Sequence, residues 1–356
     1  MVKEYGSDFS LDEIPKGVPN LCLDSPYTVY LRSGRECLKY VGLQIESEVN
    51  RILMPALCCR SMVKAFTDIG FKVDFYRLEK DLTVDWTSLL EIMEDNLAVV
   101  YINYFGRPTF TLEQLVFLKA EFRDVFIIKD ATHDFFDDKV LFGVEPDYVV
   151  ASLRKWFALP DGGIVKSTRY LLEQVVERDP EDFFTKQRTQ AMLMKHKYLA
   201  TADVSIKPLY RDVFSKCATF LSEDLAIMTM SDVSRILLEH LNVQKMSDRR
   251  RDNFMRLYQH LEHKDFINIS YSSSQTCPLY FPVVLNIDRD FVQKELAEHG
   301  IYCPVIWPIP SSAVGHCQWS EYFSANMLAL PCDHRYTESD MEYVAATLET
   351  IIQNMA

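Results

Sequence analysis

Two residues with reactive side chains, Asp130 and Lys155, each follow an apolar run that we expect to form a buried strand. The first run covers residues 125–129 and the second covers residues 148–153, and the two side chains are 25 positions apart in the chain. In open sheets of parallel strands, ligands bind beyond the carboxyl ends of the strands. We therefore expect a carboxylate and an amine to face the same space.

This pair of groups is what pyridoxal phosphate chemistry needs. A lysine amine can form a Schiff base with the cofactor, and a carboxylate keeps the pyridine nitrogen protonated so that the ring accepts electrons. Trp156 and Phe157 follow Lys155, so we expect a desolvated and therefore more nucleophilic amine. The structural alternatives are a lysine whose head reaches solvent and an aspartate that caps a helix or turn.

Three further positions could complete such a site. His133 stands three residues after Asp130 and would reach the same space. The tripeptide Ser33-Gly34-Arg35 precedes the first strong helical pattern, and a glycine at a helix N-terminus is a candidate phosphate site because free N–H groups and positive potential meet there. Ser152, three residues before Lys155, could donate its hydroxyl to the same phosphate. An ordinary cap or turn is the alternative for each.

Other kinds of site lack their motifs. No Gly-x-Gly-x-x-Gly follows a strand, and the chain contains no phosphate-binding P-loop, no Gly-x-Ser-x-Gly and no His-Glu-x-x-His. Five possible metal ligands lie late in the sequence, but their spacings match no usual zinc pattern, so we expect no metal site. These five are Cys303, His316, Cys317, Cys332 and His334.

The bulk composition narrows the class of protein. The 356 residues carry a formal net charge of −13, which argues against nucleic acids and anionic membrane surfaces as partners. Nine cysteines occur without a Cys-x-x-Cys spacing, and the sequence shows neither a signal peptide nor a run long enough to span a membrane. We expect a reduced, cytoplasmic protein.

The pattern of elements predicts an α/β protein. Continuous apolar runs alternate with helical patterns, which indicates a mainly parallel sheet covered on both faces. Gly162-Gly163 predicts a tight turn into the last of these strands. We expect helices over 34–47, 60–69, 86–93 and 111–121, and strands over 51–56, 72–78, 97–104, 125–129, 148–153 and 163–166.

The pattern changes in the second half of the chain. A long charged segment, 170–200, has heptad-like apolar spacing that Pro180 interrupts, and a second long helix is expected from about Ser231. A strand over 279–285, a helix over 290–299 and a final helix over 338–355 follow. We expect a large α/β domain over 1–235 and a smaller α+β domain over 236–356.

Taken together, the motifs resemble the DegT/StrS-type nucleotide-sugar aminotransferases, which are fold-type-I pyridoxal phosphate enzymes. The resemblance covers most of the chain and rests on motifs that occur in the family's order. These motifs are Ser33-Gly34-Arg35-Glu36-Cys37-Leu38, Met54-Pro55-Ala56, the segment 65–73, Tyr104-Phe105-Gly106-Arg107-Pro108, Asp130-Ala131-Thr132-His133, Lys155 with Gly162-Gly163, Trp307-Pro308-Ile309-Pro310 and Leu328-Ala329-Leu330-Pro331.

The resemblance implies a fold and a role for each site residue. The fold would be an aspartate-aminotransferase-like three-layer large domain with a smaller C-terminal domain. Lys155 would form the Schiff base and then move a proton between the substrate and cofactor carbons. Asp130 would pair with the pyridine nitrogen, and His133 would lie beside the ring. The phosphate would be held by Ser152, Gly34 and Arg35.

The resemblance also implies a reaction. The family passes an amino group, usually from glutamate, to a keto sugar that is linked to a nucleotide. Its products enter surface polysaccharides or secondary metabolites. Family members work as homodimers with each active site at the subunit interface.

Several positions depart from the family pattern. Cys59 stands where an aromatic residue stacks on the cofactor ring, and Arg35 replaces a threonine. The segment Ile227-Met228-Thr229-Met230 aligns with a motif whose asparagine it lacks, and Ile306 replaces a histidine. These changes leave two alternatives open: the same fold and cofactor with a different reaction or acceptor, and a degenerate, non-catalytic subunit. Retention of Lys155 disfavours a sugar dehydratase, because those relatives replace this lysine with histidine.

Overall fold

The computed structural model describes residues 2–11, 25–136, 146–175, 177, 183–224, 226–262 and 277–355. A seven-stranded sheet forms its centre, in the order β1-β7-β6-β5-β4-β2-β3. Its strands are β1 (Thr28–Leu31), β2 (Arg51–Pro55), β3 (Lys72–Tyr76), β4 (Ala98–Ile102), β5 (Phe126–Asp130), β6 (Tyr148–Ser152) and β7 (Gly163–Ser167). β7 pairs antiparallel with both β1 and β6, and every other pair of neighbouring strands is parallel, so the predicted mainly parallel sheet is confirmed.

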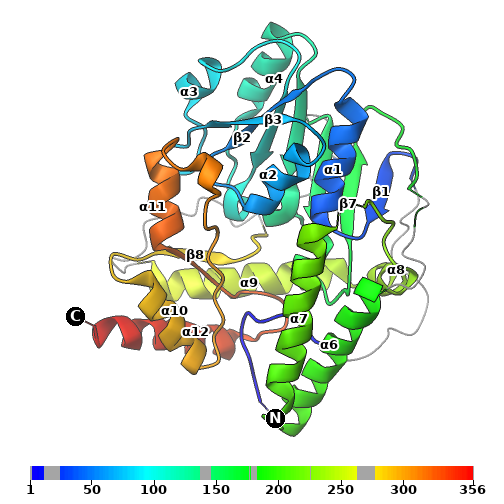
Figure 1. The fold of residues 1–356 in the computed structure, drawn as a ribbon. Helices are drawn as coiled ribbons and strands as arrows, with labels where there is room; N and C mark the ends of the chain where they lie inside the picture. The colour runs from blue at the N-terminus through cyan, green and yellow to red at the C-terminus, as the bar shows by residue number, and fades with distance from the viewer. Residues whose placement is uncertain are drawn as a thin grey trace.

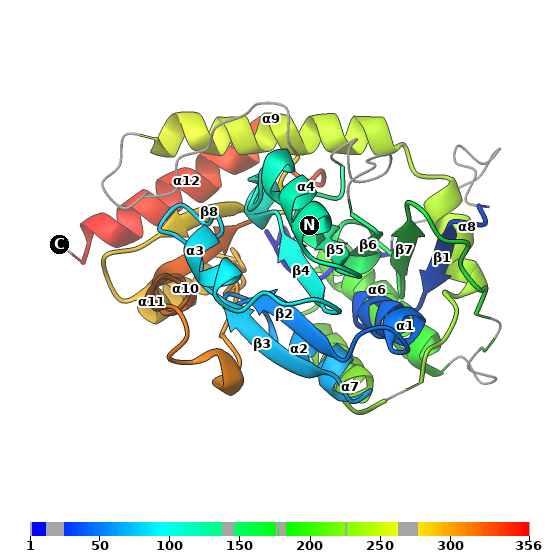
Figure 2. The same cartoon turned by 90° about the horizontal axis from the view of Figure 1, so that it is seen from above.

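Helices cover both faces of this sheet, as Figure 2 shows for α1 and α2 on one side and α4 on the other. The helices of the first half are α1 (Gly34–Ile45), α2 (Arg60–Thr67), α3 (Trp86–Leu90) and α4 (Leu112–Glu121). All four lie within one to three residues of their predicted bounds. The continuous apolar strands are buried because both faces are covered, and β4 is buried at every position.

Local sequence explains where these elements begin and end. The Ser33 side chain caps α1 by accepting a hydrogen bond from the Glu36 N–H. Thr111 and Gln114 form a capping box at the start of α4. The chain leaves α2 through Gly70, whose φ of 95° favours glycine.

The second half contains more helix than the sequence pattern indicated. Its helices are α6 (Phe183–Thr201), α7 (Ile206–Glu223), α8 (Asp232–Glu239), α9 (Val243–Leu261), α10 (Arg289–Glu298), α11 (Gln318–Asn326) and α12 (Glu338–Gln353), and a small antiparallel sheet joins β8 (Phe281–Val284) to β9 (Met327–Leu330). α6 and α7 lie side by side as a helical pair that projects from the sheet (Figure 1).

Three predictions for this half are wrong in part. The segment 170–175 is not helical, and α6 begins only at Phe183; residues 176 and 178–182, with Pro180, lie outside the described residues. The helix expected from Ser231 is two helices, because the chain breaks at 240–242 between α8 and α9. The pattern also missed α7, α11 and β9. The apolar runs of α11 and β9 are short, but the buried residues of α7 recur every three or four positions, so its helical period is present in the sequence and was overlooked.

The apolar core has separate parts. The largest cluster packs α1, α2 and the strands β2, β4 and β5 together. A distinct cluster joins β8, β9, α9, α10 and α12, and Tyr5 from the start of the chain packs into it. The domain boundary predicted near residue 235 would fall inside α8, and this division stays a prediction.

Candidate active site

A small cavity of about 110 Å³ opens at the carboxyl ends of the parallel strands. Six of the seven residues predicted to bind the cofactor line it, namely Gly34, Arg35, Cys59, Asp130, Ser152 and Lys155. Residues far apart in sequence therefore meet where the parallel-sheet rule expects a ligand. We call this space the small cavity.

Sheet register explains how the central residues meet. β5 and β6 are parallel neighbours, with Asp130 opposite Val150, so both strands end at the same edge. Asp130 is the last residue of β5 and Ser152 is the last residue of β6. A single 3-10 turn over Leu153–Lys155 then carries the lysine to the cavity.

Two glycines allow the close packing around this edge. A Cβ on Gly34 would lie 3.0 Å from the Cβ of Ser152, so only a glycine lets the start of α1 rest against the end of β6. A Cβ on Gly163 would lie 2.6 Å from the backbone carbonyl carbon of Ser33. The glycine pair expected as a turn therefore also holds the Ser33-Gly34-Arg35 segment in place.

The N-termini of two helices reach the small cavity. Gly34 is the first residue of α1, and Cys59 is the N-cap of α2, with Ser61 in its first turn. Helix N-termini attract anions because their N–H groups are not used within the helix. Arg35 adds a cation: its Nη1 donates to the Leu221 carbonyl, and burial lowers its pKa. These groups suit a phosphate.

Asp130 is buried beneath this anion-attracting end. Its Oδ1 accepts a hydrogen bond of 2.9 Å from the Thr132 N–H. Burial raises the pKa of the Asp130 carboxyl, while the hydrogen bonds from Thr132 and the nearby Lys155 cation act in the opposite direction. A second cation beside this carboxyl, such as a protonated pyridine, would stabilise its charged form.

His133 does not line the small cavity but lies beside it, fully buried between aromatic rings. Its ring centre is 5.0 Å from that of Phe105 and 4.9 Å from that of Trp307. Burial, followed by the Lys155 cation, lowers the pKa of His133 well below its usual value, so the imidazole is neutral. Within the described residues neither ring nitrogen has a hydrogen-bond partner. Such buried orphan groups are rare and mark places where a ligand can supply the partner.

Lys155 lies at the junction of two cavities. Its side chain is exposed, so the expected desolvation by Trp156 and Phe157 is wrong. These two aromatic residues are instead fully buried and point into the core. The Lys155 Nζ lies 5.8 Å from the ring centre of Trp307, the ring that also packs on His133.

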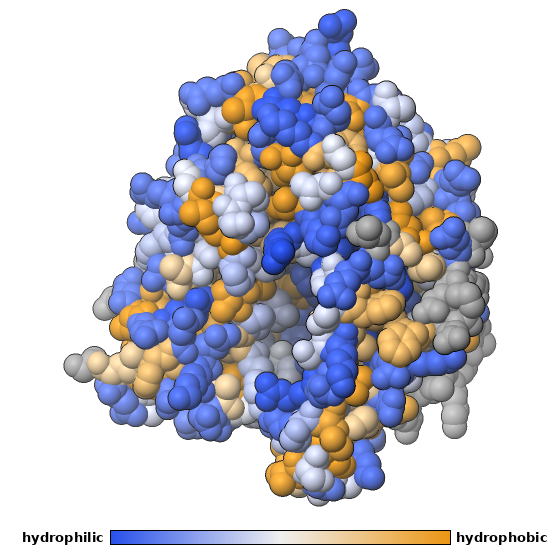
Figure 3. All heavy atoms as spheres, in the orientation of Figure 1, coloured by the Kyte–Doolittle hydropathy of each residue, from blue (hydrophilic) through white to orange (hydrophobic). Residues whose placement is uncertain are grey.

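The second cavity is larger, about 660 Å³, and Lys155 also lines it. It appears as the hollow between the α6–α7 pair and the C-terminal helices in Figure 3. Nine lysine and arginine side chains line it against four aspartate and glutamate side chains. The basic lining contrasts with the net charge of −13 of the whole chain and attracts anionic ligands. We call this space the large cavity.

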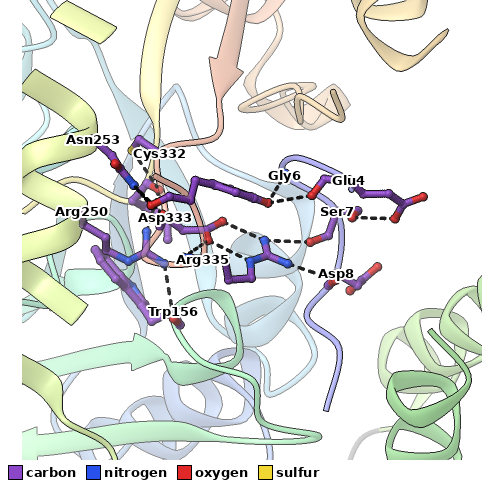
Figure 4. A network of polar contacts seen from close by, with 12 residues as sticks. Glu4, Gly6, Ser7, Asp8, Trp156, Arg250, Asn253, Cys332, Asp333 and Arg335 are labelled. Atoms are coloured by element: carbon purple, nitrogen blue, oxygen red, sulfur yellow. Dashed lines mark hydrogen bonds and ion pairs between the residues drawn. The ribbon is translucent and has the colours of Figure 1, made fainter. Parts of the chain in front are cut away.

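Residues 2–11, which we call the N-terminal segment, form one wall of the large cavity. Figure 4 shows this segment beside Arg335, which donates to the Ser7 carbonyl at 3.1 Å and forms an ion pair of 2.7 Å with Asp333. Glu4 pairs with Lys207 at 2.7 Å and with Lys195 at 3.5 Å. The segment thus connects the helical pair to the C-terminal elements.

Sequence reasoning missed three residues of this region. Arg154 lines both cavities, Ser61 lines the small cavity, and Trp307 packs against His133. The sequence could have indicated Arg154, because it directly precedes Lys155. A strand end that places one side chain at the site also brings the neighbouring residue close to it. The signal for Ser61 was its place in the first turn of a predicted helix.

The remaining expectations concern metals, cysteines and membranes. In the part of the chain that the structure describes, no group of three histidine, cysteine or acidic residues could hold a metal ion. The eight described cysteines are free thiols, including the adjacent Cys58 and Cys59. Among the described helices, none combines the length and hydropathy needed to cross a membrane.

The chain has the fold of the DegT/DnrJ/EryC1/StrS-type sugar aminotransferases, which confirms the predicted fold class. The sugar aminotransferase Spr1654 from Streptococcus pneumoniae, in its apo form, matches with a TM-score of 0.68 and 13% identity over 92% of this chain and 86% of that one. Helicobacter pylori PseC, an aminotransferase of pseudoaminic acid biosynthesis, matches with a TM-score of 0.65 and 13% identity over 99% of this chain and 100% of that one.

A DegT/DnrJ/EryC1/StrS aminotransferase from Brucella abortus is also similar, with a TM-score of 0.62 and 12% identity over 91% of this chain and 85% of that one. Spr1654 has further structures in its PLP and PMP forms. Neither protein-family models nor curated protein sequences give a match to this chain. The similarity to these proteins is therefore a similarity of fold, found by comparing structures.

Proposed function

We propose that this chain is a pyridoxal phosphate-dependent aminotransferase that acts on a sugar. The observation that supports this most is the gathering of six expected cofactor residues around the small cavity. The shared fold of sugar aminotransferases, one of which has PLP and PMP forms, supports the same activity.

The residues of the small cavity fit this cofactor. Gly34, Arg35 and Ser152 would hold its phosphate at the start of α1, where the close approach of Gly34 to Ser152 leaves no room for a larger side chain. Asp130 would face its pyridine nitrogen. The neutral His133, with both ring nitrogens unpaired, would supply a hydrogen bond beside the ring. When bound, the cofactor supplies an aldehyde that takes up and releases the amino group and a ring that accepts electrons.

The chain's own groups would then carry out three tasks. The Lys155 Nζ would hold the cofactor and later carry a proton to and from the reacting carbon, since its exposed amine faces the large cavity from which substrates arrive. Asp130 would keep the ring nitrogen protonated. Trp307 would border the amine on one side, because its ring centre lies 4.9 Å from that of His133 and 5.8 Å from the Lys155 Nζ.

The finer parts of the proposal concern the substrates and the assembly. We propose glutamate as amino donor and a nucleotide-linked keto sugar as acceptor, because both are anionic and the large cavity is basic. The resemblance further supports a cytoplasmic homodimer with the site at the subunit interface. Light scattering of the purified protein would give a mass of two chains if the dimer is correct, and a mass of one chain would contradict it.

A direct experiment tests the cofactor and the lysine together. Pyridoxal phosphate is titrated into the full chain, and the visible absorption band is followed before and after reduction with borohydride. We expect a band in the wild type and in Lys294→Ala, which removes an exposed lysine of the large cavity, and no band in Lys155→Ala. Peptide mapping should then find the reduced cofactor on Lys155. Absence of a band in the wild type would contradict the proposed function.

A different acceptor, or a different reaction on the same cofactor, is the second candidate. Cys59 favours it, because a thiol at the position of the stacking ring alters the cofactor contacts; its Sγ instead lies 3.0 Å from the Ser61 Oγ. Adding glutamate to the loaded protein separates the candidates. Conversion of the visible band to the amine form supports glutamate-driven transamination, and an unchanged band supports the second candidate.

A further inference from the structure

Two arginines line the large cavity, and one of them also lines the small cavity. Arg154 directly precedes Lys155 and lines both cavities. Arg188 projects from α6 into the large cavity and is only 8% exposed. We call Arg154 and Arg188 the arginine pair.

The arginine pair lacks the acidic partners that two buried cations need. The Nε atom of each is buried without a hydrogen-bond partner, and Arg154 forms no ion pair with any described residue. Arg188 has one acid nearby, Asp8, at 3.6 Å, and the Asp8 side chain is 52% exposed. The other contacts are aromatic: Arg154 lies over Phe184 at 5.8 Å and Arg188 over Phe214 at 4.9 Å. Rings attract cations but do not neutralise them.

Four other cations of the large cavity have partners within the fold. Lys207 and Lys195 share the buried carboxylate of Glu4, and Arg335 is paired with Asp333. These side chains are satisfied by the fold itself.

Arg250, which is 1% exposed, has no ion pair with any described residue and an unbonded Nε. It donates to the Leu279 and Trp156 carbonyls, however, and its charge helps that of Arg335 to lower the pKa of Asp333. The arginine pair therefore stands out as positive charge that the fold leaves uncompensated.

Electrostatics agrees with this geometry. Burial, and then repulsion by Arg188, lowers the pKa of Arg154 to about 9. Asp8, Asp161 and Glu36 attract Arg154 without forming an ion pair with it. The Asp8 side chain is 52% exposed, Asp161 accepts from the Ser231 hydroxyl at 2.6 Å, and Glu36 is ion-paired with Arg32 at 2.8 Å. A buried charge without a partner is costly, so a site of this kind is stabilised by an incoming anion.

We propose that the arginine pair is an anion-binding site that takes a carboxylate or phosphate group of a ligand whose reacting end lies at Lys155. Guanidinium groups bind both oxyanions through charge-assisted hydrogen bonds. This inference deepens the proposed function and rests on it for the role of Lys155. The source of the oxyanion is either the carboxylate of the amino donor or a phosphate of the acceptor.

Asp8 has a defined part in this proposal. Among the described residues it is the one acid that forms an ion pair with the arginine pair, and it approaches from the N-terminal segment with about half of its side chain exposed. An incoming anion must compete with it for Arg188. Removing its charge should therefore strengthen anion binding, which is the opposite of what loss of a structural contact would do.

The test is calorimetric titration of the full chain, saturated with pyridoxal phosphate, with two probes: inorganic pyrophosphate and 2-oxoglutarate. We expect Arg188→Gln to weaken binding of one probe about tenfold, the loss of roughly one charge-assisted hydrogen bond. The affected probe identifies the source as phosphate or carboxylate. Lys294→Gln is the matched control, because it removes an exposed cation of the same cavity, and it should have little effect. Asp8→Asn should tighten binding of the affected probe.

Thermal melting of each variant shows that it is folded. The proposal is overturned if Arg188→Gln leaves both probes unchanged, or if it weakens them no more than Lys294→Gln does. Failure of the proposed function is seen separately, as a wild type without a cofactor band. In that case the same titrations on cofactor-free protein still decide the anion site, because Arg188 does not line the small cavity.

Discussion

At the scale of single residues, the sequence predicted which side chains meet at the strand ends better than it predicted their surroundings. Asp130, Ser152 and Lys155 could be predicted because each follows a continuous apolar strand, and the carboxyl ends of such strands meet by rule. The exposure of Lys155 could not be predicted, because Trp156 and Phe157 turn into the core and leave the amine uncovered. Trp307 could not be placed beside His133 either, since 174 residues separate them and only the fold joins them.

Gly163 gives a prediction at this scale. Replacing it with alanine puts a Cβ 2.6 Å from the Ser33 backbone, which must move together with the proposed phosphate-binding segment. We expect Gly163→Ala to lose about 1–3 kcal/mol of unfolding free energy, as for other overpacked positions, and to weaken cofactor binding. Gly34→Ala, where the new Cβ meets the Ser152 Cβ at 3.0 Å, should cost less stability. Urea unfolding of both variants checks that Gly163→Ala loses more stability than Gly34→Ala. A Gly163→Ala variant as stable as the wild type would contradict the prediction.

His334 gives a pH prediction. Burial, and then the Arg250 cation, lowers the pKa of His334 to about 4 from its usual 6.5. Between these two pKa values the unfolded chain binds a proton at this histidine and the folded chain does not. The unfolding free energy is therefore not reduced by His334 above pH 6.5, and it falls as the pH falls toward 4. We expect a loss of about 2 kcal/mol over this window. Urea unfolding of His334→Gln at several pH values should show a shallower decline than the wild type, and parallel curves would contradict the assignment.

At the scale of elements, the parallel sheet and α7 were predictable and α6 was not. The strands are short, apolar and separated by capped helices, so local sequence defines them. The buried face of α6 includes Thr185, Arg188 and Lys195, which hide its helical period, whereas the buried residues of α7 recur every three or four positions. The N-terminal segment has no regular structure to predict, because its conformation comes from contacts with Lys195, Lys207 and Arg335.

The N-terminal segment carries two acids, Glu4 and Asp8, whose removal should affect stability differently. Glu4 is 7% exposed and neutralises Lys195, which is itself 1% exposed. Glu4→Gln leaves that ammonium buried without a counter-charge, so we expect a loss of roughly 3 kcal/mol of unfolding free energy. Asp8→Asn removes an exposed carboxylate from the same segment and should change stability by less than about 0.5 kcal/mol. Similar losses for both variants would contradict this division of roles.

At the scale of the whole molecule, an acidic chain surrounds a basic cavity. Composition predicted the acidic total, but the sign of the charge inside the cavity depends on which side chains the fold turns inward. Exposed charges are screened within about 10 Å at 0.1 M salt, and buried ones much less. Binding of an anionic substrate should therefore persist at moderate salt, and a KM for the substrate that rises steeply with salt would contradict this.

The N-terminal segment also links two parts of the molecule that flank the large cavity. Its Tyr5 N–H donates to the Gly300 carbonyl at 2.9 Å and its carbonyl accepts from the Tyr302 N–H at 2.7 Å, while the Val2 N–H donates to the Leu199 carbonyl at the end of α6. The rate of amide hydrogen exchange at these positions therefore measures how often the walls of the large cavity separate. Faster exchange at Tyr5 than at Val283 in β8 would reveal opening without unfolding, and a bound substrate should slow it.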